Sequence, residues 1–250
     1  MRLSLRFSGE SCNKSLDDVP GKGYNIGMET DLFTLSAPAP PPGTETTPPT
    51  SRHAVCTGAG GLVECPHFTL EEHGVSGYGP RTFANAKADA TWAYAVDFTT
   101  SGEQLTKRAA GERILQIPVG TTTEVCARLL TEHLRKLGAR SLNVAGNGIY
   151  TLAQHYPTGQ PQDLQAKLDT YVLKVLTLVH TEYPLSQVRS GGQTGVDEAG
   201  IKAGIALGIP TLALLPNGFR IRNAIGVDIT MTRKAAWRRF VTNPPDDSIF

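Results

Sequence analysis

Apolar runs alternate with amphipathic stretches along the chain from residue 83 onward. Residues 90–96 are almost continuously apolar, which is typical of a parallel strand covered on both faces. Similar runs follow, and segments with helical spacing separate most of them. The predicted strands are residues 90–96, 114–117, 141–145, 183–188 and 211–215.

Capping and stop signals mark the ends of the predicted helices. Ser101 opens a capping box, and Gly138 and Gly208 supply C-terminal stops. The predicted helices are residues 101–110, 122–137, 164–179 and 194–207. In the second of them, the stripe predicted to face the core consists of Val125, Leu129, Leu130, Leu134 and Leu137.

Strands that alternate with helices predict an α/β protein with a Rossmann-like, mostly parallel sheet and helices on both of its faces. In such sheets, ligands bind beyond the carboxyl ends of the strands. The loops that follow the predicted strands are therefore the first candidates for a functional site.

The regular pattern occupies residues 81–250, which we predict to be one Rossmann-like domain. Residues 37–50 contain six prolines, which exclude a helix or a central strand. Residues 51–80 have no clear period and are predicted to form an irregular insert or a small hairpin, so residues 37–80 are a Pro-rich connector followed by that insert. Residues 1–36 are predicted to hold a strand and a Gly-rich loop that could join the main sheet.

Charge and composition exclude some classes of partner. Lys plus Arg (24) balance Asp plus Glu (23), which disfavours nucleic acid, and no apolar run is long enough to span a membrane. Four cysteines are few and irregularly spaced, so a reduced, cytoplasmic environment is expected. The basic cluster of residues 233–239 predicts a solvated helix face or a subunit contact, which leaves a homo-oligomer open.

A group of histidines and cysteines lies in the irregular stretch. It consists of His53, Cys56, Cys65, His67 and His73. Their spacing matches no common structural zinc finger, so no metal is predicted. Scattered surface histidines and buried cysteines are the simpler interpretation.

The strongest chemical signal is the glycine-rich junction between the strand at residues 183–188 and the following helix. It consists of Ser190, Gly191, Gly192, Gln193, Thr194 and Gly195. Backbone N–H groups at such a junction can hold a phosphate. Asp197 and Glu198 follow at once, where they could engage a ribose hydroxyl or an attacking water. The alternative is that the glycines only allow close packing and that the two acids only face the helix dipole.

Three more loops follow predicted strands and are expected to share a pocket with this junction. Their candidate phosphate- or nucleotide-binding residues are Thr99, Thr100, Ser101, Gly102, Gly146, Asn147, Gly148, Gly218 and Arg220. Each has a simpler alternative: helix capping for residues 99–102, a tight turn for residues 146–148, and a solvated basic loop for residues 218–222. Arg222 could serve in place of Arg220.

Residues 190–197 resemble the signature of the molybdenum-cofactor-carrier-like proteins. These belong to the SLOG superfamily of Rossmann-like nucleotide-binding domains, which includes the LOG phosphoribohydrolases. Residues 206–210 and 216–218 fit the same family. Residues 88–106 and 142–146 are similar to the family's second half but precede the signature here, which suggests a circular permutation. The resemblance covers residues 82–230, and residues 8–23 are similar to a phage-encoded element.

The resemblance implies a nucleotide or an ADP-ribose-like ligand, with Asp197 or Asp89 at the ribose and no certain resident cofactor. It also implies two alternatives. One is hydrolysis of a nucleotide N-glycosidic bond, because Glu198 falls at the position of the catalytic glutamate of LOG enzymes, although Ser190 replaces their proline. The other is carriage of molybdenum cofactor. Relatives of this type often form oligomers.

Overall fold

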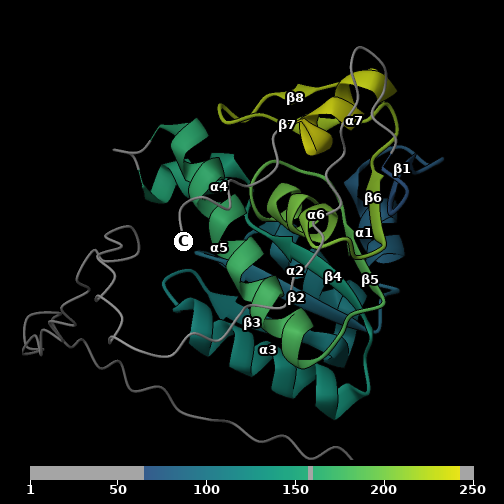
Figure 1. The fold of residues 1–250 in the computed structure, drawn as a ribbon. Coiled ribbons are helices and arrows are strands. Elements are labelled where there is room, and N and C mark those ends of the chain that lie inside the picture. The colour runs from purple at the N-terminus through teal and green to yellow at the C-terminus, as the bar shows by residue number, and fades with distance from the viewer. Residues whose placement is uncertain (1–64, 157–159, 243–250) are drawn as a thin grey trace, which may run out of the picture.

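The computed structural model describes residues 65–156 and 160–242, and these form an α/β fold around one parallel sheet (Figure 1). Six strands lie in the order β1-β6-β5-β4-β2-β3, and all neighbours are parallel. The strands are β1 (Phe68–Glu72), β2 (Ala90–Ala95), β3 (Ile114–Pro118), β4 (Ser141–Gly146), β5 (Gln187–Ser190) and β6 (Thr211–Leu215).

Helices connect the strands, and an antiparallel hairpin follows the last strand of the sheet. The helices are α1 (Tyr78–Asn85), α2 (Ser101–Ala110), α3 (Thr123–Leu137), α4 (Ile149–His155), α5 (Pro161–Glu182), α6 (Val196–Ala206) and α7 (Arg233–Val241). The hairpin consists of β7 (Ile221–Arg222) and β8 (Asp228–Ile229), and a 3-10 turn, η1 (Gly111–Arg113), precedes β3.

The apolar core lies mainly on one face of the sheet, under α3, α5, α6 and α7 (Figure 1). Trp92 and Tyr94 of β2 pack there against α3 and α5, while Phe68 and Leu70 of β1 pack against α6 and α7. Helices α1 and α2 cover the opposite face, where Arg189 of β5 donates to the Ala84 carbonyl of α1 at 3.2 Å. Both faces are thus covered, which explains the continuous apolar runs of the central strands.

The fold class expected from the sequence is confirmed, as are four of the five predicted strands. Helix α3 ends at Gly138 in a left-handed conformation (φ 63°), as its sequence predicts. The interpretation of residues 65–80 as irregular is wrong, because they contain β1, which pairs with β6 in the main sheet, and the start of helix α1. The cause is that β1 is an edge strand in which only alternate residues, Phe68 and Leu70, are buried.

Smaller differences concern the ends and faces of elements. The predicted strand at residues 183–188 lies instead at residues 187–190, so Ser190 ends the strand. The side chain that caps α2 is that of Thr100, which accepts from the Glu103 N–H, and not that of Ser101. In α3, Cys126 and Ala127 are buried, while Val125, Leu129 and Leu137 of the predicted stripe are exposed by more than a third.

The order of the strands reverses between β2 and β4. From β2 the chain moves outward to β3, and it then returns across β2 to β4, β5 and β6. At such a reversal, the connections leave the two strands in opposite directions and open a crevice at their carboxyl ends. Within the described residues, no helix has the length and hydropathy needed to cross a bilayer.

Candidate functional site

The loops that follow β2 and β4 meet at Asn147, where the strand order reverses. The Asn147 Oδ1 atom accepts from the N–H groups of Val96 (2.8 Å) and Asp97 (3.1 Å), and its Nδ2 donates to the Asp97 carbonyl at 3.2 Å. A Cβ atom at Gly146 would overlap the Tyr94 carbonyl, so a side chain there would push the strands apart. Residues 146–148 therefore hold two loops of the predicted site together.

Local contacts account for two of the three hydroxyl residues in the loop after β2. The Asp97 Oδ1 atom accepts from both the N–H (2.7 Å) and the hydroxyl (2.6 Å) of Thr99, and these bonds lower the pKa of Asp97. Thr100 caps α2. Ser101 and Gly102 stay exposed at the first turn of α2, where they can face a ligand.

Glu103 is a site residue that the sequence indicated only as part of a capping box. Its side chain is buried (4% exposed) beside Asn147, whose Nδ2 lies 3.5 Å from Oε1. The other carboxyl oxygen, Oε2, is buried and has no hydrogen-bond partner among the described residues. Burial raises the pKa of Glu103 to about 8, and the nearby Asp197 and Asp97 carboxylates act in the same direction. Glu103 therefore keeps its proton at neutral pH.

The glycine-rich junction at residues 190–195 is called the signature loop below. Its three glycines are buried, and each allows a close approach of neighbouring atoms. A Cβ atom at Gly191 would overlap the Arg81 guanidinium, and one at Gly192 would overlap the Leu215 side chain. Gly195 lies against the Asn147 carbonyl with φ +92°. The packing role considered as an alternative from the sequence is therefore present in the structure.

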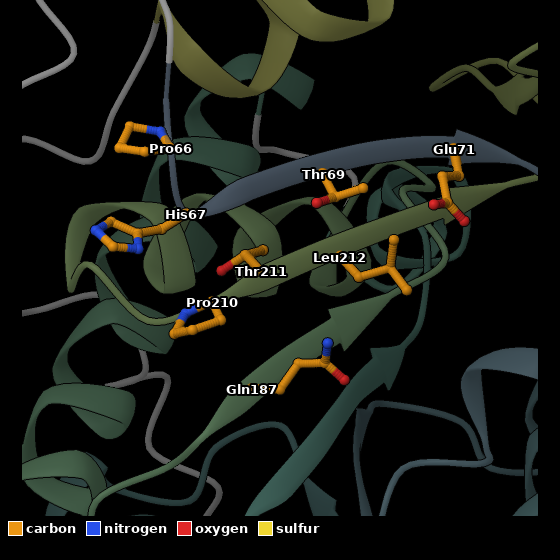
Figure 2. Close-up of a pocket in the computed structure, with 8 residues that line it drawn as sticks. All are labelled: Pro66, His67, Thr69, Glu71, Gln187, Pro210, Thr211 and Leu212. Atoms are coloured by element: carbon orange, nitrogen blue, oxygen red, sulfur yellow. The ribbon is translucent and has the colours of Figure 1, made fainter.

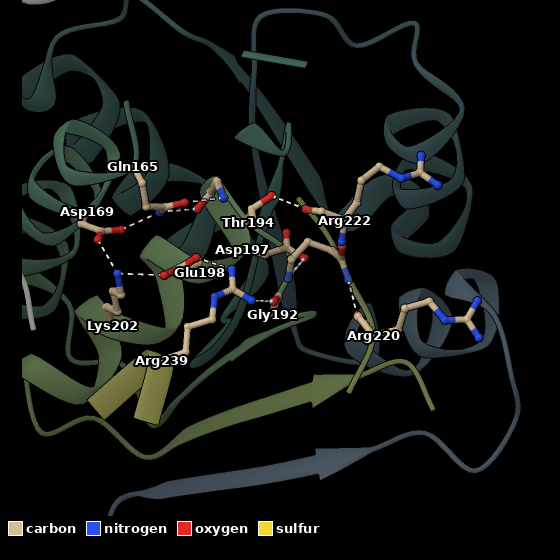
Figure 3. A network of polar contacts seen from close by, with 12 residues as sticks. Gln165, Asp169, Gly192, Thr194, Asp197, Glu198, Lys202, Arg220, Arg222 and Arg239 are labelled. Carbon is tan, nitrogen blue, oxygen red and sulfur yellow. Dashed lines mark hydrogen bonds and ion pairs between the residues drawn. The ribbon is translucent and has the colours of Figure 1, made fainter. Parts of the chain in front are cut away.

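Polar groups of the same loop are bonded from both sides (Figure 3). On one side, the Gly195 N–H donates to Gln165 Oε1 of α5 at 2.7 Å. On the other, the Gln193 amide pairs with the Arg220 carbonyl (3.0 Å) and the Arg222 N–H (2.9 Å), and the Thr194 hydroxyl donates to the Arg222 carbonyl (2.8 Å). The loop thus links α5 to the β7–β8 hairpin, and part of its hydrogen-bonding capacity is used internally.

The end of the strand before this loop is also fixed. Ser190 is fully buried, and its hydroxyl donates to the Val144 carbonyl of β4 at 2.7 Å. Because this hydroxyl faces the neighbouring strand, it is not presented to a ligand.

Asp197 and Glu198 are adjacent in sequence but have different partners. Asp197 (5% exposed) accepts from Arg81 of α1 at 3.1 Å. Burial raises the pKa of Asp197, and Arg81 opposes this rise. Glu198 (6% exposed) pairs with Lys202 at 2.9 Å and with Arg239 of α7 (Figure 3). Both Glu198 oxygens therefore face cations.

Asp89 does not join the other predicted site residues. Its Oδ2 atom accepts from the N–H groups of Arg140 (3.0 Å) and Ser141 (2.8 Å), and these bonds lower the pKa of Asp89. Ser141 is the first residue of β4, so Asp89 lies at the amino ends of the strands. A ribose bound at the carboxyl edge lies at the other end of the sheet from this carboxylate.

Tyr78, Arg81, Gly218 and Arg220 complete the carboxyl edge on the side of β1 and β6. Arg81 and Tyr78 belong to α1, a helix that the sequence pattern does not predict, and Tyr78 lies in the stretch predicted to be irregular. Gly218 donates through its N–H to Glu72 Oε2 at 2.6 Å and precedes Arg220 in the turn that leads to β7. A strand followed by Gly74, Gly77 and Gly79 was the signal that could have indicated this part of the site.

A groove of about 330 Å³ lies elsewhere, along β1 from Pro66 to Glu71 and over the amino-terminal ends of β5 and β6 (Figure 2). Its lining is Pro66, His67, Thr69, Glu71, Gln187, Pro210, Thr211 and Leu212. Within residues 65–156 and 160–242 there is no cluster of three or more metal-ligating side chains. His53 and Cys56 lie outside the described residues, so the metal prediction for them stays a prediction.

No protein-family model matches the chain, and a search of curated proteins finds no match for it. The fold and the site define a Rossmann-like α/β protein whose polar loops gather at a reversal of the strand order. Membership of the SLOG superfamily remains a prediction from the residues quoted above.

Proposed function

We propose that the protein binds a small phosphorylated molecule of the nucleotide class at the carboxyl edge of the sheet. One observation carries this proposal: Asn147 joins the loops after β2 and β4 at the strand-order reversal, beside the buried and unpartnered Glu103 oxygen. Crevices at such reversals are where open parallel sheets bind ligands. A buried polar atom without a partner is costly, so a ligand group that reaches it gains affinity.

Two groups at this edge have a proposed task. Protonated Glu103 can donate a hydrogen bond to a sugar oxygen or a base acceptor. The exposed first turn of α2, at Ser101 and Gly102, can face an anionic group. The SLOG-type ancestry, a cytoplasmic location and a homo-oligomeric assembly belong to the same proposal and rest on the sequence.

The contacts of Glu198 favour binding over hydrolysis by this residue. A carboxylate that orients water or stabilises an oxocarbenium ion needs an oxygen that faces the substrate. Both oxygens of Glu198 are held by cations, one by Lys202 and the other by Arg239. Carriage of molybdenum cofactor would use the same edge, because its pterin carries a phosphate.

Calorimetry with AMP, ADP and ADP-ribose tests the proposal, together with mass spectrometry of molecules that co-purify with the protein. Gly102→Asp is the informative variant, because a Cβ atom at Gly102 meets no other atom within 4 Å. The added carboxylate should repel phosphate and weaken binding of the tightest nucleotide at least tenfold.

Thr181→Asp is the matched control, because it adds the same charge at an exposed position near the C-terminal end of α5. Binding should be unchanged in this variant. Failure of all three nucleotides to bind, with no phosphorylated compound co-purifying, would refute the proposed function.

A further inference from the structure

Three arginines surround Tyr78 at the carboxyl edge. The Arg81 and Arg222 guanidinium carbons lie 5.8 and 5.7 Å from the centre of the Tyr78 ring. Arg220 is close enough to act electrostatically on both Tyr78 and Asp228. Segments far apart in sequence, namely α1, the turn after β6, and β7, thus bring three positive charges to one aromatic ring.

Carboxylates neutralise this cluster only in part. Arg81 pairs with Asp197, and the Arg222 Nε donates to Asp228 Oδ1 at 2.8 Å. The Arg220 guanidinium has neither a hydrogen bond nor an ion pair to any described residue, and Figure 3 shows it projecting to the same side as that of Arg222. The cluster therefore has one positive charge in excess of its two carboxylates.

The cluster also holds an unused hydrogen-bond donor. The Tyr78 hydroxyl is buried, and it lies close to the Asp228 carboxylate without making a well-aligned hydrogen bond to it. Burial and the neighbouring Asp228 carboxylate raise the pKa of Tyr78 to about 12, so the hydroxyl keeps its proton. Tyr78 is also the first residue of α1, whose N-terminus has no side-chain cap.

The signature loop offers less to an anion than this cluster does. Its glycines are buried, its Gly195 N–H is bonded to Gln165, and the Asp197 carboxylate lies 3.5 Å from the Gln193 N–H. An anion at that N–H would meet the carboxylate of Asp197. Two forked guanidinium groups suit phosphoryl oxygens better, because each can bind two of them at once.

We propose that Arg220, Arg222 and the Tyr78 hydroxyl form a subsite for the diphosphate group of the ligand. Each of Arg220 and Arg222 engages one phosphoryl group, and the Tyr78 hydroxyl donates to a phosphoryl oxygen. Arg81, which also lies beside the Tyr78 ring, adds positive charge. The ligand class is then a nucleoside diphosphate or its derivative. This inference rests on the proposed function for the rest of the ligand but has a readout of its own.

The probes are ADP and inorganic pyrophosphate, measured by calorimetry on the full chain. Arg220→Ala and Arg222→Ala should each lower the affinity for both probes by about tenfold to a hundredfold, because each variant loses a charge-assisted pair of hydrogen bonds. Tyr78→Phe should weaken them by about threefold to tenfold. Pyrophosphate affinity should fall as salt rises.

These variants leave the local backbone in place, because the loop and hairpin are joined through the Arg220 carbonyl and the N–H and carbonyl of Arg222. Their melting temperatures should therefore stay close to that of the wild type. Arg128→Ala is the control, since Arg128 is an exposed arginine on α3 with a 4.0 Å pair to Glu132. It should bind both probes normally.

The outcomes separate the two proposals. ADP binding that is unaffected by Arg220→Ala, Arg222→Ala and Tyr78→Phe would overturn the subsite and leave the proposed function standing. Arginine-dependent binding of pyrophosphate without binding of any nucleotide would support the subsite and refute the proposed function. Binding of neither probe would refute the subsite, because the free diphosphate should still bind.

Discussion

At the scale of single residues, the carboxyl group that is available to a ligand is that of Glu103, whereas the sequence indicated that of Glu198. Glu198 has two cationic partners, whereas Glu103 has an oxygen with none among the described residues. Burial stabilises the neutral form of a carboxyl group, and neighbouring carboxylates reinforce this effect. Glu103 is therefore a hydrogen-bond donor at neutral pH, which an ordinary glutamate is not.

The pKa of Glu103 gives a prediction for stability against pH. Its pKa is about 8 in the folded protein and 4.5 in an exposed glutamate. The folded state thus keeps a proton that the unfolded state has lost, so stability falls as pH rises from above 4.5 through 8. Between pH 6 and 7.5 the loss should approach about 1.4 kcal/mol per pH unit.

Glu103→Gln should remove this slope, because the amide resembles the protonated acid and does not titrate. Urea unfolding of both proteins at pH 6, 7 and 8 measures the difference. Parallel pH profiles for the two proteins would show that Glu103 is ionised in the folded state.

Two glycines of the site should respond in opposite ways to the same substitution. Gly192 has φ +66°, and a Cβ atom there would overlap Leu215. Gly192→Ala should therefore destabilise the protein by roughly 2–5 kcal/mol through backbone strain and overpacking.

Gly102→Ala is the control, because Gly102 lies in the first turn of α2 and its Cβ position is open. It should be neutral or stabilise the protein by up to about 1 kcal/mol. Thermal unfolding of the two variants measures the contrast. Equal melting temperatures would mean that the loop can relax away from Leu215.

At the scale of elements, buried charges link three helices beside the signature loop. Lys202 of α6 pairs with Asp169 of α5 at 2.7 Å and with Glu198 at 2.9 Å, and Arg239 of α7 also pairs with Glu198. Burial disfavours the ionised forms of these side chains, and the neighbouring opposite charges offset this cost only while the set is complete. The network therefore fixes α5 and α7 against α6.

Lys202→Met should cost about 3–5 kcal/mol, because it leaves Asp169 and Glu198 buried with fewer counter-charges. The double variant Asp169→Asn with Lys202→Met should recover part of this loss, because it removes the carboxylate whose ion pair is lost in Lys202→Met, whereas Glu198 keeps Arg239. Denaturant unfolding of both variants measures the recovery. A double variant no more stable than Lys202→Met alone would contradict the coupling.

The elements also show which structure the sequence could predict. Strands β2, β3, β4 and β6 were predicted because their apolar runs match burial inside a covered sheet. β1 was missed because an edge strand buries only alternate residues. The position of β5 was shifted because Arg189 and Ser190 lie in the strand and use partners on α1 and β4, which no local pattern reveals.

The same reasoning explains the residues of the site. The glycine-rich junction and residues 146–148 follow strands in sequence, so their placement at the carboxyl edge was predictable. Arg81 meets Asp197 across 116 residues of chain, and its importance arises only from that contact. Glu103 is distinguished by burial, which its exposed neighbours in the sequence do not indicate.

At the scale of the whole molecule, the two edges of the sheet have separate properties. The carboxyl edge gathers Asn147, Glu103, Arg81 and the Tyr78 cluster, while the amino edge holds Asp89. Parallel strands give all connections the same polarity, so residues at one edge do not reach ligands at the other. A substitution at the amino edge should therefore change the stability of the protein without changing ligand binding at the carboxyl edge.

Asp89→Asn tests this separation. The folded-state pKa of Asp89 lies below its ordinary value because the Ser141 and Arg140 N–H groups bond to its carboxylate. Its contribution to stability is therefore present above the ordinary pKa of an aspartate and is lost as pH falls through the folded-state value. At neutral pH the variant should lose about 1 kcal/mol, since the carboxylate is largely exposed. The wild type and the variant should converge in stability in acid.

Ligand binding should not follow this loss. If the nucleotide lies at the carboxyl edge, ADP should bind Asp89→Asn with wild-type affinity, whereas Gly102→Asp binds it weakly. A tenfold loss of ADP affinity in Asp89→Asn, with the fold intact, would place the ribose at the amino edge. The Tyr78 cluster could not then contact the phosphates of the same molecule, because it lies at the opposite end of the strands.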